Sequence, residues 1–221
     1  MSERGTQFLK SIQAQSWIIT LQDHPERLER ALATKAAMRE AGYDCCLWLA
    51  FDNRKGWLES GPASAYKFPL GMIGIYLSHY MLWQAWMQMC DEEWILIMED
   101  DAVWVPDPET AKSAIMDFWR EADALQLEPK MIYLGGIECR EHPTQLGEKI
   151  MKPDYLAGIY GYAVHRSVVE ESFHIFREMT FHFDNLVVEN LHRGIFKDQV
   201  FAIHPYVIVE AGFQSTLYGA T

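Results

Sequence analysis

Short apolar runs alternate with longer segments of helical periodicity along the first half of the chain. Residues 17–21 (WIITL), 43–51 (YDCCLWLAF) and 94–98 (WILIM) have the length and composition of buried strands. Between the first two runs, an early proline and a closing Gly42 predict a helix over 25–41. Strands that alternate with helices in this way are typical of an α/β fold.

The most apolar long stretch is residues 71–89 (GMIGIYLSHYMLWQAWMQM). It is interrupted by Ser78, His79 and two glutamines, so the pattern predicts a buried core helix and no transmembrane segment. Further helices are predicted over 109–125 and 166–177, and further strands over 131–134 and 158–164.

These elements predict a single domain over residues 1–221 with a mostly parallel central sheet flanked by helices. No repeat, low-complexity tract or Gly/Ser linker indicates a domain boundary. Residues 1–15 (MSERGTQFLKSIQAQ) lack the apolar core of a signal peptide, and we expect them to be a loose N-terminal segment.

Composition narrows the choice of partners. The chain has 31 acidic and 19 basic residues, and the net charge of -12 disfavours extensive nucleic-acid binding while leaving room for a local basic groove. The four cysteines lack a CxxC pair or a metal-ligand spacing. We therefore expect reduced thiols and a cytoplasmic location.

Three consecutive carboxylates, Glu99, Asp100 and Asp101, follow the strand at 94–98. The carboxyl ends of strands are where open α/β sheets bind their ligands. Adjacent carboxylates repel one another unless a cation neutralises them, and oxygen ligands suit Mg²⁺ or Mn²⁺. The triplet thus indicates a site for a metal and a nucleotide, although a solvated loop of acids would have the same sequence.

Several segments occur together in a particular order. They are IITLQDHPERLER, GMIGIYLSHYMLW, WILIMEDDAVW, IYLGG, GIYGYAVHRS and FHFDNLVVENL. This succession resembles glycosyltransferase family 25, the lipooligosaccharide and procollagen galactosyltransferase type, over roughly residues 16–216. SHxxLW followed by a strand and EDD is the most specific part of the resemblance.

The resemblance implies a GT-A-type nucleotide-binding fold and transfer of a sugar with inversion at the anomeric carbon. The donor would be a nucleoside-diphosphate sugar, a UDP-sugar in our prediction, with Mn²⁺ or Mg²⁺ as the cofactor. The acceptor would be a hydroxyl on a glycan, a protein or a modified nucleobase. Asp101 would bind the metal directly, Glu99 would face a metal-bound water or the donor ribose, and Asp100 would lie against the bound donor.

Other positions match the family less specifically. On the donor side these are Thr20, Leu21, Arg27, Ser78, His79, Gln214 and Ser215. Arg27 would pair with a phosphate or fix the loop, but a solvated helix residue is an equal alternative. For His79 the alternative is a core histidine bonded to backbone.

The catalytic base implied by the resemblance is Asp184, with Glu189 as the second candidate. Asp184 would also suit the N-cap of a helix over 185–193. His204 is a candidate additional metal ligand, or a plain histidine at the end of a strand.

Three other functions use some of the same residues. A nucleotidyltransferase would have the same metal and nucleotide site but attack phosphorus, and an inactive GT-A-like domain would only bind the nucleotide sugar. A receiver domain of a response regulator would also place acids after ILIM, but its phosphate-accepting Asp would be Asp154, which no apolar strand precedes.

Overall fold

The computed structural model describes residues 2–53, 58, 68–105, 107–138, 143–153 and 156–211. The helices are α1 (Glu3–Ala14), α2 (Pro25–Glu40), α3 (Leu70–Met89), α4 (Pro108–Ala124), α5 (Arg166–Phe176), α6 (Phe183–Val187) and a π-helical turn, η2 (Val188–His192). The strands are β1 (Ser16–Thr20), β2 (Cys45–Leu49), β3 (Trp94–Glu99), β4 (Ala102–Trp104), β5 (Met131–Glu138), β6 (Thr144–Gln145), β7 (Ile150–Lys152), β8 (Leu156–His165), β9 (Val200–Ile203) and β10 (Ile208–Glu210).

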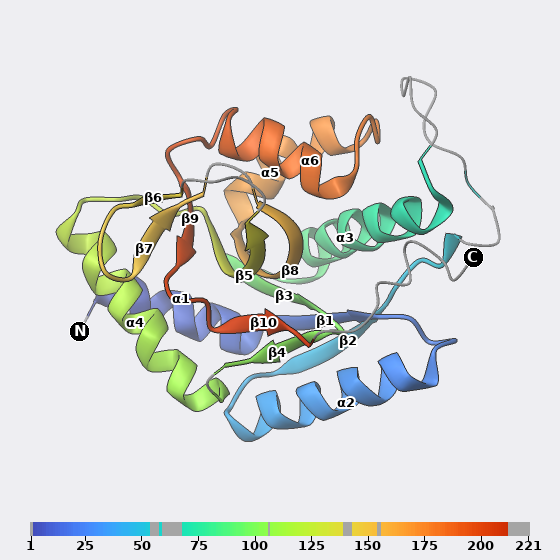
Figure 1. The fold of residues 1–221 in the computed structure, drawn as a ribbon, viewed down its shortest axis with the longest axis horizontal. Coiled ribbons are helices and arrows are strands. Elements are labelled where there is room, and N and C mark those ends of the chain that lie inside the picture. The colour runs from blue at the N-terminus through green and yellow to red at the C-terminus, as the bar shows by residue number, and fades with distance from the viewer. Residues whose placement is uncertain are drawn as a thin grey trace.

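The main sheet has the strand order β2-β1-β3-β8-β5-β9-β7-β6 (Figure 1). β8 runs antiparallel to both β3 and β5, and β7 runs antiparallel to β9 and β6. The other strands share one direction, so the predicted mostly parallel sheet is confirmed.

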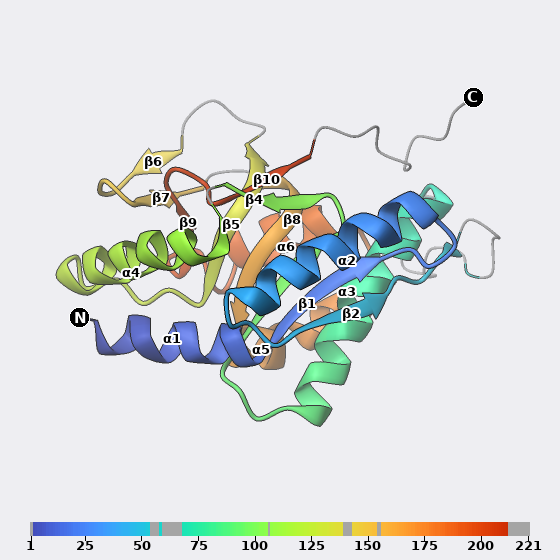
Figure 2. The same ribbon diagram turned by 90° about the horizontal axis from the view of Figure 1, so that it is seen from below.

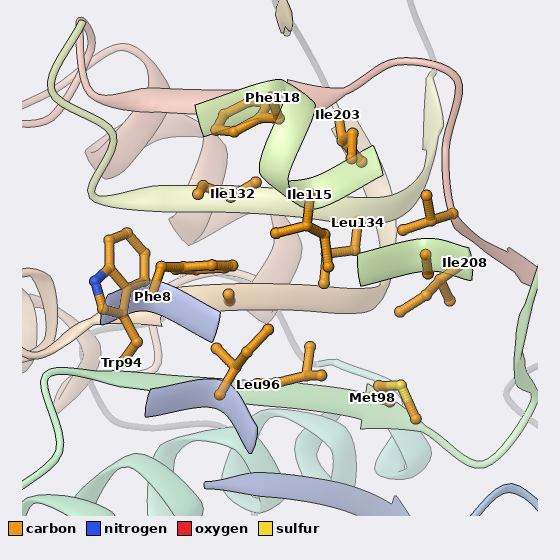
Figure 3. Close-up of a cluster of buried hydrophobic side chains, with 14 of the residues drawn as sticks. Phe8, Trp94, Leu96, Met98, Ile115, Phe118, Ile132, Leu134, Ile203 and Ile208 are labelled. Carbon is orange, nitrogen blue, oxygen red and sulfur yellow. The ribbon is translucent and has the colours of Figure 1, made fainter. Parts of the chain in front are cut away.

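Helices cover both faces of this sheet (Figures 1 and 2). Side chains of α1, α2 and α4 form one buried cluster with the sheet, and those of α3, α5 and α6 form the other. β3 contributes to both because successive side chains of a strand point to opposite faces. Leu96 and Met98 belong to the first cluster, shown in Figure 3, and Ile95 and Ile97 to the second.

The N-terminal segment differs from the sequence prediction. Helix α1 begins at Glu3, and the Ser2 hydroxyl caps it by accepting the Gly5 N–H at 3.0 Å. Phe8 and Ile12, four residues apart on one helical face, are buried in the first cluster. Figure 3 shows Phe8 within it. The expectation of a loose segment over 1–15 is therefore wrong for the described residues, because this face of α1 completes the core.

A two-stranded antiparallel ribbon joins β4 to β10, and the sequence prediction included neither strand. β10 crosses close to the main sheet at two glycines. A Cβ on Gly135 would lie 2.3 Å from the Ile208 carbonyl oxygen, and one on Gly161 would lie 2.9 Å from the Ile208 side chain. These glycines permit the approach that brings β10 to the end of β3.

Among the helices of the described residues, none combines the length and apolarity needed to cross a bilayer. Within the same residues, Cys45, Cys46 and Cys90 are free thiols.

Candidate active site

The three acids predicted to be functional lie at the carboxyl end of β3. Glu99 is the last residue of the strand, and Asp100 and Asp101 form the turn that leads into β4. In the neighbouring strand β1, Ile19 is in register with Glu99, which places Thr20 at the same edge of the sheet. The carboxyl ends of the parallel strands β1 and β3 thus bring residues 20–21 and 99–101 to the same edge of the sheet.

Asp100 is held in an ion pair with Arg27 from the first turns of α2. Both carboxylate oxygens accept a hydrogen bond from Arg27 Nε at 2.9 Å, and Oδ1 also accepts one from a terminal nitrogen at 2.5 Å. The Asp100 side chain is fully buried. Burial lowers the pKa of Arg27, but the hydrogen bonds and charge of Asp100 outweigh this effect and raise it overall. Arg27 therefore fixes the acid turn, and Asp100 is neutralised within the protein.

Glu99 contacts a buried histidine from α3. His79 Nε2 lies 3.4 Å from Glu99 Oε1, and His79 Nδ1 lies 3.0 Å from the Tyr162 hydroxyl on β8. Burial lowers the pKa of His79 to about 3, so the ring is neutral at physiological pH. Burial raises the pKa of Glu99 well above its ordinary value, and the charges of Asp101 and Asp184 raise it further.

Asp101 has a buried carboxylate oxygen, Oδ1, without a hydrogen-bond partner among the described residues. Burial and the charge of Asp100 raise its pKa, and Glu210 of β10 adds to the shift. The backbone of the turn is tied to the end of β10, since the Ala211 N–H donates to the Asp101 carbonyl at 2.9 Å. An unpartnered carboxylate oxygen in an acidic surrounding is the arrangement that a cation would stabilise.

Asp184 lies in the first turn of α6, and its charge acts on Glu99. Its Oδ2 accepts the N–H of Gly158 at 2.9 Å, where Gly158 has a φ of +64°. The helix begins one residue earlier, at Phe183, so His182 occupies the N-cap position. The alternative of Asp184 as the cap of a helix over 185–193 is therefore wrong. Burial raises the pKa of the Asp184 carboxyl, and the Gly158 hydrogen bond opposes that shift.

These residues suit a divalent ion that is shared with a substrate. In the parts of the chain that the structure describes, no group of three or more His, Cys, Asp or Glu side chains is placed to hold a metal. Mg²⁺ and similar ions are usually bound by one or two carboxylates and complete their shell with water and substrate phosphates. Asp101 and Glu99 fit that limited requirement.

The remaining donor-side candidates lie around the same edge. Thr20 is buried, and its hydroxyl has no partner within the described residues, while Leu21 follows it directly. The Ser78 hydroxyl donates to the Gly74 carbonyl at 2.6 Å and accepts the Phe51 N–H at 2.8 Å. Ser78 thus ties the segment after β2 to α3, and its contact with a donor stays a prediction.

Other predicted residues are not brought to the acids by any described contact. Glu189 is exposed on η2 and pairs with Arg193 at 3.0 Å. His204 follows β9, and its backbone N–H donates to the Lys149 carbonyl at 2.9 Å. Gln214 and Ser215 lie outside the described residues.

The structure adds residues that the sequence prediction overlooked. Glu210 follows the apolar residues 207–209 at the end of a strand, and this is the same signal that identified the three acids. Tyr162 and Gly158 had no comparable signal, because their roles depend on partners from α3 and α6.

Comparison with known proteins identifies the family of the chain. Residues 58–187 match the family described as glycosyltransferase family 25 (LPS biosynthesis protein). No curated protein sequence matches the chain.

Among solved structures, a glycosyltransferase involved in the glycosylation of the major capsid of PBCV-1 aligns with a TM-score of 0.51 and 15% identity, over 91% of this chain and 94% of that chain. This likeness shows a shared fold. Mouse xyloside xylosyltransferase 1 in its apo form aligns with a TM-score of 0.42 and 10% identity, over 90% of this chain and 97% of that one. A 4-diphosphocytidyl-2C-methyl-D-erythritol synthase from Anaerococcus prevotii aligns with a TM-score of 0.43 and 14% identity, over 93% and 95%.

The family match spans more than half of the 221 residues and includes the acid turn at the end of β3, α3 with Ser78 and His79, and Asp184. The chain therefore belongs to glycosyltransferase family 25, and its chemistry is the transfer of a sugar.

Proposed function

We propose that the protein is a metal-dependent, inverting glycosyltransferase that uses a nucleoside-diphosphate sugar, specifically a UDP-sugar. The observation that carries the proposal is the convergence of two carboxylates at the end of β3, Glu99 and Asp101, with a third on α6, Asp184. Glu99 and Asp101 are two residues apart, and His79 contacts Glu99 with its edge and stacks on Phe183, the residue before Asp184.

On the donor side, Asp101 would hold a Mn²⁺ or Mg²⁺ ion with its unpartnered oxygen, and Glu99 would face a water of that ion or the donor ribose. The ion, when bound, neutralises the negative charge that builds on the departing diphosphate. Thr20 and Leu21, at the end of β1, lie beside the base and ribose. Arg27 contributes indirectly by keeping Asp100 neutralised and the turn in place.

On the acceptor side, Asp184 is the general base. It takes the proton of the acceptor hydroxyl as that oxygen forms a bond to the anomeric carbon and the bond from this carbon to the diphosphate breaks. The Gly158 N–H fixes the orientation of the carboxylate. A carboxylate with a raised pKa is a stronger base than an ordinary aspartate, provided that it stays ionised at the working pH.

The acceptor group is a hydroxyl on a glycan, a protein or a modified nucleobase. A cytoplasmic location is likewise part of the proposal. Glu189, His204, Gln214 and Ser215 keep their predicted roles, but no described contact supports them.

The first experiment is a thermal-shift and calorimetric screen of the protein against UDP, GDP, CMP and their sugar conjugates, with and without Mn²⁺. We expect metal-dependent stabilisation by UDP or a UDP-sugar, because a ligand that binds only the native state stabilises it. Asp101→Ala is expected to lose this response. The control is Asp117→Ala, which removes an α4 carboxylate paired with Arg120 on the surface.

Product analysis completes the test. Release of a free nucleoside diphosphate supports sugar transfer, and an inverted anomeric configuration in the product supports the single-displacement mechanism. Release of pyrophosphate would indicate a nucleotidyltransferase instead. Absence of any response to nucleotides, with or without metal, would contradict the proposal.

A further inference from the structure

A chain of buried polar groups runs behind the proposed metal and donor site. It begins at the indole of Trp83 on α3, passes through the Tyr162 hydroxyl on β8 and the His79 ring on α3, and ends at Glu99. Trp83, Tyr162 and His79 are almost completely buried. Such groups are expected to satisfy one another, and their donor and acceptor roles can be assigned in order.

The hydrogen bond from Trp83 determines the donor and acceptor order of the whole series. An indole nitrogen can only donate, so Trp83 Nε1–H donates to the Tyr162 hydroxyl oxygen at 3.1 Å. The hydroxyl hydrogen of Tyr162 then needs an acceptor. Within the described residues the acceptor in reach is His79 Nδ1, at 3.0 Å. Nδ1 must be unprotonated to accept it.

The ring proton of His79 is consequently on Nε2, which faces Glu99 Oε1 at 3.4 Å. The opposite tautomer would leave the Tyr162 hydroxyl hydrogen without an acceptor and would turn a lone pair toward the Glu99 carboxylate. A doubly protonated ring would leave the same hydroxyl hydrogen unsatisfied. The hydrogen-bond pattern therefore selects one state of the histidine.

Aromatic packing holds the ring in this orientation. The His79 ring stacks on Phe183 with centroids 4.5 Å apart and an interplanar angle of 17°, and it stacks on Tyr162 at 5.8 Å and 29°. Phe183 directly precedes Asp184. His79 thus contacts Glu99 through its edge and the residue before the proposed base through its face.

We propose that His79 is a positioning residue, held by Tyr162 and Trp83 in the Nε2–H tautomer so that it orients the Glu99 carboxylate and supports α6 at Asp184. This inference rests on the proposed function for its effect on catalysis. Its structural part, the tautomer, is independent of any substrate. The role differs from the direct donor contact predicted for His79 from the sequence.

The test combines nitrogen NMR of the His79 ring with the variant Tyr162→Phe. In the wild-type protein we expect an unprotonated Nδ1 and a protonated Nε2, assigned by the loss of these signals in His79→Gln. Tyr162→Phe keeps the stacked ring but removes the hydroxyl that donates to Nδ1, so the Nδ1 signal is expected to shift to that of a nitrogen without a hydrogen bond. Affinity for Mn²⁺ in the presence of UDP is expected to fall roughly 10-fold, the loss that is usual for residues outside the ligand shell that support a metal site.

Tyr76→Phe is the matched control. Its hydroxyl is also buried in the cluster of α3, α5 and α6, but it donates to the Phe176 carbonyl. This variant should leave the His79 tautomer and the Mn²⁺ affinity unchanged, whatever its effect on stability.

A wild-type ring protonated on Nδ1, or on both nitrogens, would overturn the inference even if Tyr162→Phe does not fold. An unchanged Nδ1 signal and unchanged Mn²⁺ affinity in Tyr162→Phe would also overturn it. If the wild-type protein binds no nucleotide with metal, the proposed function fails, and the wild-type NMR result alone decides whether the tautomer is assigned correctly.

Discussion

Glu99, Asp101 and Asp184 carry negative charge into a partly buried corner of the protein. Burial is the largest cause of the raised pKa in each of them. The same environment that makes these groups useful for binding a cation or taking a proton therefore destabilises the native state when they are ionised. Single substitutions at these acids therefore test both their role in activity and their effect on stability.

Replacing Asp184 by asparagine is expected to lower kcat by roughly 10²- to 10⁴-fold, the usual contribution of a general base. The amide can still accept the Gly158 N–H, so folding and Mn²⁺-dependent UDP binding should persist. In the wild-type protein kcat should fall as the pH drops through the raised pKa of Asp184, because a protonated carboxyl cannot accept the acceptor proton. Steady-state kinetics across pH, with calorimetry of UDP binding, would check this, and undiminished kcat in the variant would remove Asp184 as the base.

The variant Asp101→Asn is expected to raise the Tm of the metal-free protein by about 2–4 °C, which for a chain of this size corresponds to roughly 1 kcal/mol. The reason is that the amide fills the same space without an ionised oxygen that lacks a partner. The same change should abolish Mn²⁺-dependent UDP binding. Asp117→Asn at the exposed pair with Arg120 serves as the control and should change Tm little. A lower Tm with retained UDP binding would count against a metal role for Asp101.

At the scale of elements, the site depends on how α2, β10 and β3 meet. The Arg27–Asp100 pair joins the start of α2 to the turn after β3, and Gly135 lets β10 pass close enough to bond that turn. Both contacts join segments that are distant in the chain.

Arg27→Gln is expected to lower the free energy of unfolding by about 3–5 kcal/mol, because it leaves the Asp100 carboxylate buried without its cation. Denaturant titration would measure the loss. Arg39→Gln, at an exposed position of the same helix, should change it by less than about 0.5 kcal/mol. The double variant Arg27→Gln, Asp100→Asn should recover part of the loss, and additive losses would show that the pair is not coupled.

Gly135→Ala is expected to lower the free energy of unfolding by about 1–3 kcal/mol. The added methyl would lie 2.3 Å from the Ile208 carbonyl oxygen, so β10 would have to shift. Transfer activity should fall with it, because the Ala211 bond to Asp101 lies at the end of the displaced strand. Gly136→Ala is a neighbouring control whose methyl meets the end of the Leu156 side chain, which can move aside more easily. Equal losses in the two variants, measured by denaturation and turnover, would mean that the β10 contact is unimportant.

For the whole molecule, a net charge of -12 adds to the repulsion within the acidic site. Because Glu99, Asp101 and Asp184 have folded pKa values above their unfolded ones, the native state holds more protons than the unfolded state in the window between them. Their contribution to stability is present at low pH and is lost as the pH rises through this window.

The measurable consequence is a pH-dependent difference between two proteins. The stability of the metal-free Asp101→Asn, Asp184→Asn double variant relative to wild type should increase as the pH rises from about 4 through the raised pKa values. Denaturant titrations at a series of pH values would measure it, and the comparison cancels the opposite effect of exposed acids with lowered pKa. A difference that is constant with pH would contradict the assigned shifts.

Much of the fold could be predicted from local pattern. The strands at 17–21 and 94–98 and the helices at 25–41, 71–89, 109–125 and 166–177 appear in the structure with boundaries within a few residues. Each carries a periodicity that is complete within one element. The helix α1 was missed because its burial depends on Trp94 and Trp119, which are distant in sequence.

The candidate site could be predicted in part. The acid turn was identifiable because three carboxylates end an apolar strand, and Asp184 because it matches a family position. The residues that contact these acids could not be predicted in the same way. Arg27 had an equally plausible role as a solvated helix residue, and Tyr162, which bonds His79 next to Glu99, has the sequence context of an ordinary buried strand residue.

Local patterns in the sequence were enough to identify the α/β class, the family and the location of the acids, because strand and helix periodicity and the order of motifs can be read along the chain. Packing of distant segments determines which acid is neutralised by Arg27, which is left with an unpartnered oxygen and which faces His79. Hydrogen bonds and charge interactions depend on distances of a few ångström between groups far apart in the chain, and only the packed fold sets those distances.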